Sequence, residues 1–157
     1  MTGPRYRSAA EADVATIRAL LLELAAHDGG HPTGSEEQLR AHGFGPRPLW
    51  HGILAEGAAP VGLVIFYPDF STVRGQPGLF VQDLYVRQSA RGAGVGPGLL
   101  AAAAQAARRD WGAAYLTLGV SPGNGGAKAL YERMGFQARG YEFLILEGSG
   151  WDRLEAT

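Results

Sequence analysis

The stretch "RQSARGAGVGPGLLAAAAQAA", residues Arg87–Ala107, combines a glycine-rich segment with a run of alanines. Glycine is costly in chain entropy, so four glycines within residues 92–98 indicate an unusual backbone path or a ligand close to the main chain. Alanine has the highest helix propensity of all residues. Pro97 suits the first turn of a helix, where no backbone N–H is needed. The stretch therefore predicts a loop that leads directly into a helix.

The segment before this loop, residues 79–86 (LFVQDLYV), has the β-branched and aromatic content of a strand. A strand, loop and helix in this order present free N–H groups at the positive end of a helix dipole, which is a site for phosphate. The P-loop is excluded because Pro97 and Gly98 stand where that motif needs Lys and Ser or Thr. The glycine spacing of the dinucleotide-binding motif is not met either. From the glycines alone, a phosphate site and a tight turn without a ligand both stay open.

Patterns elsewhere predict a mixed order of strands and helices. A helix follows from Val14, Ile17, Leu21 and Leu24 at helical spacing, with Asp13 placed to cap it. Strands are expected at 5–8, 49–56, 60–68, 79–86, 114–120, 136–140 and 141–147, a loop at 69–78, and further helices at 36–43, 95–111 and 127–134. The crossover rule predicts that 79–86 and 114–120 are parallel neighbours. The fold class is therefore α/β, with a central mixed sheet flanked by helices.

Two of these elements carry specific signals. Ser35 and Gln38 have the spacing of a capping box, and Gly43 is expected to stop the short helix that they begin. Residues 114–120 (AYLTLGV) are so apolar that we expect both faces of this strand to be buried.

Composition limits the classes of function. The chain has 157 residues, which predicts a single domain over 1–157, and 14 basic against 15 acidic residues, which gives no surface typical of nucleic-acid binding. Without cysteine there is no disulfide, thiolate metal site or cysteine nucleophile. His27 and His31 have the spacing of two metal ligands on a helix, but Gly29, Gly30 and Pro32 argue against a helix there, so we expect no metal. No segment suggests a signal peptide or membrane span, and we expect a cytoplasmic protein.

Two motifs together resolve the ambiguity of the glycines. Arg91-x-x-Gly94-x-Gly96 and Asn124-x-x-Ala127-x-x-x-Tyr131, followed by Gly135-Phe136, resemble the GNAT superfamily of acetyl-CoA-dependent acetyltransferases in order and spacing. The resemblance covers most of the chain and implies a splayed mixed sheet, with acetyl-CoA as co-substrate. It implies that the following residues bind that co-substrate: Leu84, Tyr85, Val86, Arg91, Gly92, Ala93, Gly94, Val95, Gly96, Pro97, Gly98, Asn124 and Tyr131. The amides of the loop would hold its pyrophosphate.

A narrower resemblance concerns the acceptor. Residues 33–56, IFYPDF at 65–70 and DLYV at 83–86 are similar to the spermidine/spermine acetyltransferase group, which includes thialysine acetyltransferases and acts on primary amines. In that group a glutamate commonly precedes the equivalent of Asp83, whereas this chain has Gln82. An amide can orient an amine through its carbonyl but cannot accept its proton near neutral pH. The group is usually dimeric, so the resemblance also implies a homodimer.

Several residues are candidates for roles in acetyl transfer, each with an ordinary structural alternative. Tyr131 would be the acid that protonates the leaving thiolate, although its spacing with Leu130 and Met134 also fits a core aromatic. Asp83 would anchor the amine or position water, although it could equally be an ordinary carboxylate at a strand edge. Tyr67 is expected to bind the substrate together with Gln82 and Asp83. Tyr67, Trp50 and Phe70 could line the amine channel, although core packing also explains each of them. Arg91 and Lys128 could approach phosphate groups, with solvated surface charge as the alternative for Lys128.

Two classes of function follow. The first is an N-acetyltransferase that acts directly on a small diamine, polyamine or amino acid, with peptide or protein amines as the less favoured acceptors. The second is an acyl-CoA-binding module or sensor without turnover, which the absence of the glutamate makes conceivable.

Overall fold

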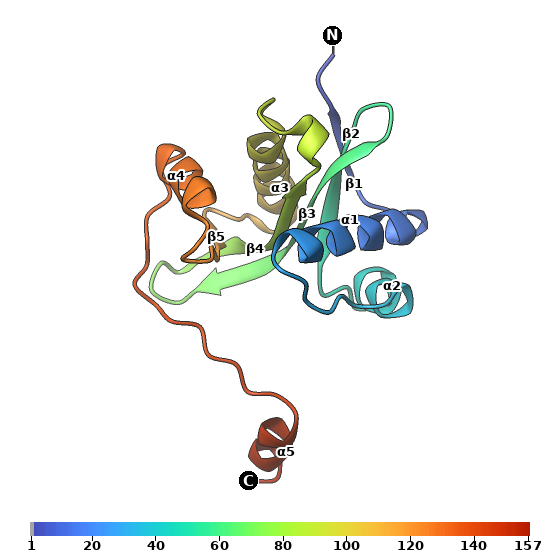
Figure 1. The fold of residues 1–157 in the computed structure, drawn as a ribbon. Coiled ribbons are helices and arrows are strands. Elements are labelled where there is room, and N and C mark those ends of the chain that lie inside the picture. Colours follow the sequence, from blue (N-terminus) through green and yellow to red (C-terminus); the bar gives the residue numbers. More distant parts are fainter. Residues whose placement is uncertain (1) are drawn as a thin grey trace. The chain divides into compact units, whose positions relative to one another are not determined.

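The computed structural model describes residues 2–157, which form two compact units, one ending at Gly119 and one from Val120 to Thr157 (Figure 1). The first unit holds β1 (Arg5–Ser8), η1 (Glu11–Asp13), α1 (Val14–His27), α2 (Glu36–Phe44), β2 (His51–Glu56), β3 (Pro60–Ser71), β4 (Gln76–Val86), η2 (Gln88–Ala90), α3 (Val95–Trp111) and β5 (Leu116–Leu118). The second holds α4 (Gly125–Arg133) and α5 (Ser149–Glu155). No helix within residues 2–157 is both long enough and apolar enough to cross a membrane.

The sheet of the first unit has the strand order β1-β2-β3-β4-β5. Neighbouring strands from β1 to β4 are antiparallel, while β4 and β5 pair in parallel around the crossover helix α3. The α/β fold class and the parallel neighbours predicted from sequence are thus confirmed.

Helices cover both faces of this sheet (Figure 1). On one face, Ile17 and Leu20 of α1 form a buried cluster with Leu54, Leu63 and Ile65 of β2 and β3. The other face packs against α3, whose Trp111 ring lies 6.2 Å from the ring of Phe66 in β3. Each central strand is therefore apolar on both sides, which explains its near-continuous hydrophobic sequence.

The helix signals read from sequence are partly correct. Ser35 and Gln38 form the predicted capping box, because Ser35 Oγ accepts from the Gln38 N–H at 3.1 Å and Gln38 Oε1 accepts from the Ser35 N–H at 2.9 Å. Asp13 is the N-cap residue of α1, as predicted, but its side chain makes no bond to that helix, because its carboxylate accepts from the Ala10 N–H at 2.7 Å in the 3₁₀ turn before α1. Gly43 does not stop α2 but lies inside it, where a Cβ would collide with the Trp50 ring.

One irregularity interrupts the pairing of β3 with β4. Ile65 is opposite Asp83 and Phe66 is opposite Val81, so Gln82 is an extra residue in β4. Two residues of one strand then face one of its partner, which defines a β-bulge. Beyond the bulge, no residue of β4 from Asp83 to Val86 pairs with β5 in the part of the chain that the structure describes. The sheet therefore opens between these two parallel strands.

Three predictions about strands were wrong. Most of the loop expected at 69–78 is strand, because β3 and β4 continue to a tight turn at 72–75. Strand β5 is shorter than 114–120, and its residues are half-buried rather than enclosed on both faces. Residues 136–147 form no strand, and α5 follows them.

Candidate active site

The bulge in β4 gathers three of the predicted acceptor residues on one face of the sheet. Asp83 shares the α1 face with its partner Ile65, which packs against α1. Tyr67 lies two residues after Ile65 in β3, so it points to the same face. Its hydroxyl donates a hydrogen bond to Gln82 Oε1 at 3.3 Å. Tyr67, Gln82 and Asp83, the three residues expected to bind the substrate, thus lie together, and their contact with an acceptor stays a prediction.

The Asp83 carboxyl is half-buried in β4. Burial raises its pKa above the ordinary value, because removal from water disfavours the charged form. His31 acts in the opposite direction, and Asp28 raises the pKa further. Burial is also the main cause of the raised pKa of the Tyr67 phenol, with contributions from Asp69 and Asp83. This combination of enclosure and charge is typical of a functional carboxylate.

The glycine loop joins the end of β4 to the start of α3. Gly92 and Gly94 have positive φ angles, 79° and 77°, which side chains other than glycine rarely adopt. Gly94 is the N-cap of α3, and the Gly98 N–H donates to its carbonyl at 3.0 Å. The N–H groups of Val95 and Gly96 are therefore at the open start of the helix. Pro97 lies in the first turn, as predicted.

The other two glycines of the loop have different explanations. Gly98 permits a close approach, because a Cβ there would collide with the hydroxyl of Tyr6 in β1. Gly96 has no such contact, since its Cβ would meet only Val86 Cγ2 at the ordinary distance of 3.9 Å, and its φ is not positive. Glycine costs stability in a helix. No tertiary contact requires glycine at Gly96, although Pro97 disfavours helical backbone for a side-chain-bearing residue before it. The space beside Gly96 is open to a ligand.

Arg91 connects this loop to the preceding strand, β4, through a side-chain hydrogen bond. Its Nε donates to the carbonyl of Val86 at 2.9 Å, and its guanidinium lies 5.8 Å from the centre of the Tyr85 ring. Tyr85 itself packs against the α1 core. In this structure Arg91 therefore positions the loop, and its contact with a phosphate stays a prediction.

Asn124 and Tyr131 belong to the second unit. Asn124 caps α4, because its Oδ1 accepts from the Ala127 N–H at 3.2 Å. The Tyr131 ring lies 5.4 Å from that of Phe136, and burial raises the pKa of its phenol. A raised pKa keeps the hydroxyl protonated well above neutral pH, as a proton donor requires. Their contacts with a co-substrate remain predictions.

The remaining candidates differ in their surroundings. Trp50 packs against the α1 core, so core packing accounts for it. Core packing does not account for Phe70, which is 64% exposed near the end of β3. Lys128 is exposed in α4. Helix α1 ends at His27, so His27 and His31 do not share one helical face.

Sequence reasoning missed the influence of Asp28 and His31 on the pKa of Asp83. His31 was weighed only as a metal ligand with His27, and Asp28 was not singled out. Both residues follow α1 in the chain, and no local pattern links their segment with β4.

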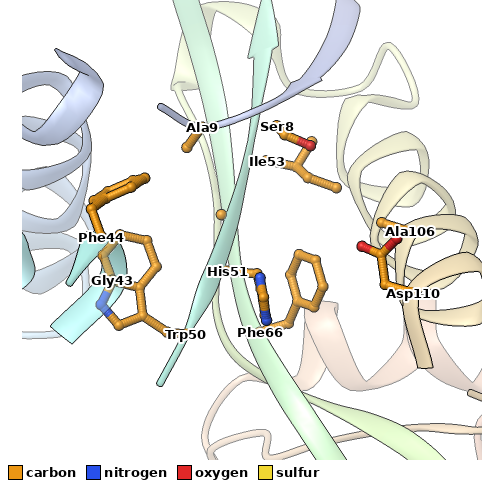
Figure 2. Close-up of a pocket in the computed structure, with 11 residues that line it drawn as sticks. Ser8, Ala9, Gly43, Phe44, Trp50, His51, Ile53, Phe66, Ala106 and Asp110 are labelled. Carbon is orange, nitrogen blue, oxygen red and sulfur yellow. The ribbon is translucent and has the colours of Figure 1, made fainter. Parts of the chain in front are cut away.

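A small cavity of about 90 Å³ lies elsewhere, where β1 ends against β2. Figure 2 shows Phe44 and Trp50 on one side of the strand and His51, Phe66 and Asp110 on the other. Burial lowers the pKa of His51, and Asp110 opposes this effect. Of the residues that the sequence suggested for the site, Trp50 lines this cavity, whereas Gln82, Asp83, Tyr67 and the glycine loop do not. We therefore place the candidate active site at the bulge and the glycine loop.

Comparisons with known proteins agree with this arrangement. The sequence profile of the acetyltransferase (GNAT) family matches residues 17–136. Thialysine N-epsilon-acetyltransferase of Bos taurus is 33% identical, over 92% of this chain and 87% of that protein, and the protein of the same name from Mus musculus is 32% identical, over 96% and 91%. An integron cassette protein from the mobile metagenome of V. cholerae has a TM-score of 0.81 over the full length of both chains, at 21% identity. That last likeness concerns the fold alone.

Proposed function

Because this chain belongs to the GNAT acetyltransferase family and is an acetyltransferase acting on an amine, we propose that acetyl-CoA is its donor and a small-molecule primary amine its acceptor. Diamines, polyamines and amino acids are the candidate acceptors. The acetyl group would pass directly from the thioester to the amine. The observation that carries this proposal is the bulge, which sets Gln82, Asp83 and Tyr67 on one face at the point where β4 parts from β5.

Binding of acetyl-CoA is proposed for the glycine loop and the end of β4. The left-handed Gly92 and Gly94 and the unfilled position at Gly96 fit a pyrophosphate close to the backbone. Main-chain groups of Leu84, Tyr85 and Val86 have no partner in β5 and could pair with the pantetheine arm. Arg91 and Asn124 are proposed to contact the same molecule.

For the chemistry, the chain has candidates for two roles. Asp83 would hold the acceptor ammonium by charge, with Gln82 and Tyr67 orienting it through hydrogen bonds. Tyr131 would donate a proton to the sulfur as the carbon–sulfur bond breaks. The amine must be neutral when its electron pair attacks the carbonyl carbon.

The acceptor class follows from the charges. This chain has Gln82 where the group that it resembles commonly has a glutamate, so it lacks a carboxylate that would attract a multiply charged polyamine. An amino acid or monoamine is therefore favoured over spermine as acceptor. The curated relatives described above are named for thialysine, an amino acid whose side chain ends in a primary amine. We therefore propose thialysine-like amino acids as the first acceptors to examine.

An amine panel tests the proposal. Release of the CoA thiol would be followed with thialysine, lysine, a diamine, spermidine and a simple monoamine, and isothermal calorimetry would measure acetyl-CoA binding. The proposal expects acetyl-CoA binding and amine-dependent thiol release. Binding without turnover on the whole panel would contradict a small-amine acceptor.

Two further expectations rest on resemblance and sequence. We propose a homodimer, as is usual in the group that this chain resembles. The cytoplasmic location inferred from sequence likewise remains a prediction.

A further inference from the structure

Strands β3 and β4 continue past α1 (Figure 1), so the sheet face that holds the proposed amine site extends beyond that helix. Residues two apart in a strand point to the same face, and Asp69 therefore lies on the face of Tyr67. The Cα atoms of these two residues are about 6.8 Å apart along the strand. Tyr67 donates a hydrogen bond to Gln82, and its ring stacks on that of Phe80, with the ring centres 5.2 Å apart. Asp69 is thus one side-chain repeat away from the residues proposed to orient the amine.

A phenol from β5's approach and a guanidinium from the β3–β4 turn gather around Asp69. The Tyr115 hydroxyl donates a bond of 2.6 Å to Asp69 Oδ2. The Tyr115 ring lies against Gly78, the partner of Asp69 in β4, where a Cβ would collide with it. The Arg74 guanidinium lies 5.4 Å from the centre of the same ring. These three residues, Asp69, Arg74 and Tyr115, are called the Asp69 patch below.

The Asp69 patch presents a carboxylate and a guanidinium that do not neutralise each other. Within residues 2–157, neither Asp69 nor Arg74 takes part in an ion pair, and Tyr115 contacts both of them. Asp69 is half-buried and Arg74 is exposed, so a solute can reach the patch. One anion and one cation held on the same ring are complementary to an ammonium and a carboxylate carried by the same carbon atom.

From these contacts we propose that the Asp69 patch binds the α-ammonium and the α-carboxylate of an amino-acid acceptor, and so selects amino acids over diamines and monoamines. The inference rests on the proposed function. Asp69 accepts hydrogen bonds from the α-ammonium, and Arg74 donates to the α-carboxylate. Six bonds separate the two nitrogens of lysine or thialysine, a span of about 7 Å when extended. This span matches the repeat from Asp69 to Tyr67, so the side-chain amine reaches the proposed amine site.

Four amines test the patch on wild type, without any substitution. Thialysine carries both charged groups, bis(2-aminoethyl) sulfide lacks the carboxylate, 3-(2-aminoethylthio)propanoate lacks the α-amine, and 2-(ethylthio)ethylamine lacks both. All four keep the reacting amine and the sulfur atom. We expect kcat/KM for thialysine to exceed that of each singly truncated amine by about tenfold, because a hydrogen-bonded charge is lost in each. The difference should lie in the KM for the amine rather than in kcat, since the patch is remote from the reacting carbonyl.

Two substitutions assign the two charges. Arg74→Gln should remove the advantage that the carboxylate gives, so that thialysine becomes no better than bis(2-aminoethyl) sulfide. Asp69→Asn should lower kcat/KM for the two amines with an α-ammonium relative to the two without it. The KM for acetyl-CoA should not move in either variant. A merely structural role would instead weaken all four amines alike.

Control variants have the same chemical change outside the patch. Arg47→Gln and Asp152→Asn alter exposed residues and should retain the wild-type selectivity among the four amines. Thermal melting of each variant checks that the fold is retained.

The outcomes are distinguishable. If wild type releases no thiol with any amine of the full panel, the proposed function is overturned, and this inference with it. If wild type is active but uses thialysine and 2-(ethylthio)ethylamine equally well, only the role of the Asp69 patch is overturned. Wild-type ratios among the four amines in both Arg74→Gln and Asp69→Asn would overturn it as well.

Discussion

Gln82 is the residue at which this chain departs from the group that it resembles. We predict that Gln82→Glu shifts preference towards spermidine and moves the rising limb of the pH profile to lower pH. The new carboxylate attracts additional positive charge and can accept a proton. The measurement is kcat/KM for spermidine, a diamine, lysine and a monoamine across pH.

A matched control for this variant is Gln76→Glu, an exposed glutamine at the start of the same strand. It adds the same charge away from Asp83 and should leave selectivity unchanged. If wild type already prefers spermidine and Gln82→Glu changes neither selectivity nor pH profile, position 82 is not part of the amine site.

Tyr131 offers a second test at the level of one residue. Because burial raises the pKa of its phenol, the hydroxyl is present at neutral pH and can donate a proton. We predict that Tyr131→Phe lowers turnover by about 10²- to 10⁴-fold and leaves acetyl-CoA affinity nearly unchanged. Turnover would be measured where chemistry limits the rate, with Tyr141→Phe, an exposed tyrosine, as control. Unchanged turnover would make Tyr131 a packing residue.

At the scale of elements, a substitution at the start of α3 should affect the stability of the fold and the binding of acetyl-CoA differently. We predict that Gly96→Ala changes the free energy of unfolding by less than about 1 kcal/mol, because it restricts the unfolded chain but also places a Cβ in helical backbone directly before Pro97. The same methyl group should weaken acetyl-CoA binding by about tenfold or more, a change of about 1.4 kcal/mol. Denaturant unfolding and calorimetry would measure the two effects.

Gly126→Ala is the matched control, because Gly126 is likewise the second residue of a helix and has open space around it. It should raise stability without the loss of affinity. Equal affinity of Gly96→Ala and wild type would argue against a pyrophosphate at this helix start.

Arg7 in β1 forms ion pairs with Asp13 of η1 and Glu56 of β2, and these three residues are the Arg7 cluster. Arg7 makes bonds of 2.7 and 2.8 Å with Asp13 and of 2.7 Å with Glu56, and Arg7 holds the pKa of Asp13 below its ordinary value. A carboxyl whose pKa is lower in the folded than in the unfolded state stabilises the fold at pH values above its unfolded-state pKa. This stabilisation is lost as the pH falls through the folded-state pKa. We predict that Asp13→Asn lowers the free energy of unfolding by about 1.5 kcal/mol at pH 7.

Denaturant unfolding at several pH values would check this prediction. The difference between variant and wild type should shrink as pH falls below the ordinary pKa of an aspartate. Asp152→Asn, an exposed aspartate in α5, should show no such difference. A difference that is constant with pH would mean that the charge of Asp13 is not what stabilises the fold.

Elements with local signals were predictable from the sequence, whereas features set by long-range pairing were not. The capping box at Ser35 and the alanine helix depend on neighbours in the chain, and both are present. The bulge at Gln82 depends on the register of β3, which no local pattern shows. The glycine loop and Asp83 were identifiable by resemblance, but the influence of His31 and Asp28 on the pKa of Asp83 depends on how the folded chain brings distant segments together. Residues 141–147 have a strand-like composition but pair with no strand among the described residues.

At the scale of the whole molecule, this last segment carries a run of exposed apolar side chains. Leu144 is 92% exposed and Ile145 is 82% exposed. We predict that wild type sediments as the proposed homodimer and that the double variant Leu144→Ser, Ile145→Ser shifts towards monomer, because contiguous exposed apolar side chains favour association. Analytical ultracentrifugation at micromolar concentration would measure this. Val73→Ser, at an equally exposed position in the β3–β4 turn, is the control, and a monomeric wild type would contradict the prediction.

The bulge also bears on how such an enzyme can diversify. Gln82 has no register partner in β3, so its replacement changes the side chain that meets Tyr67 and the acceptor but leaves the backbone pairing of β3 with β4 intact. Asp83, one residue on, is paired with Ile65 and constrained by the core beneath it. A lineage can therefore explore new acceptor amines through point mutations at one position while the sheet keeps its register. Selection on substrate range and selection on folding then act on different, adjacent residues.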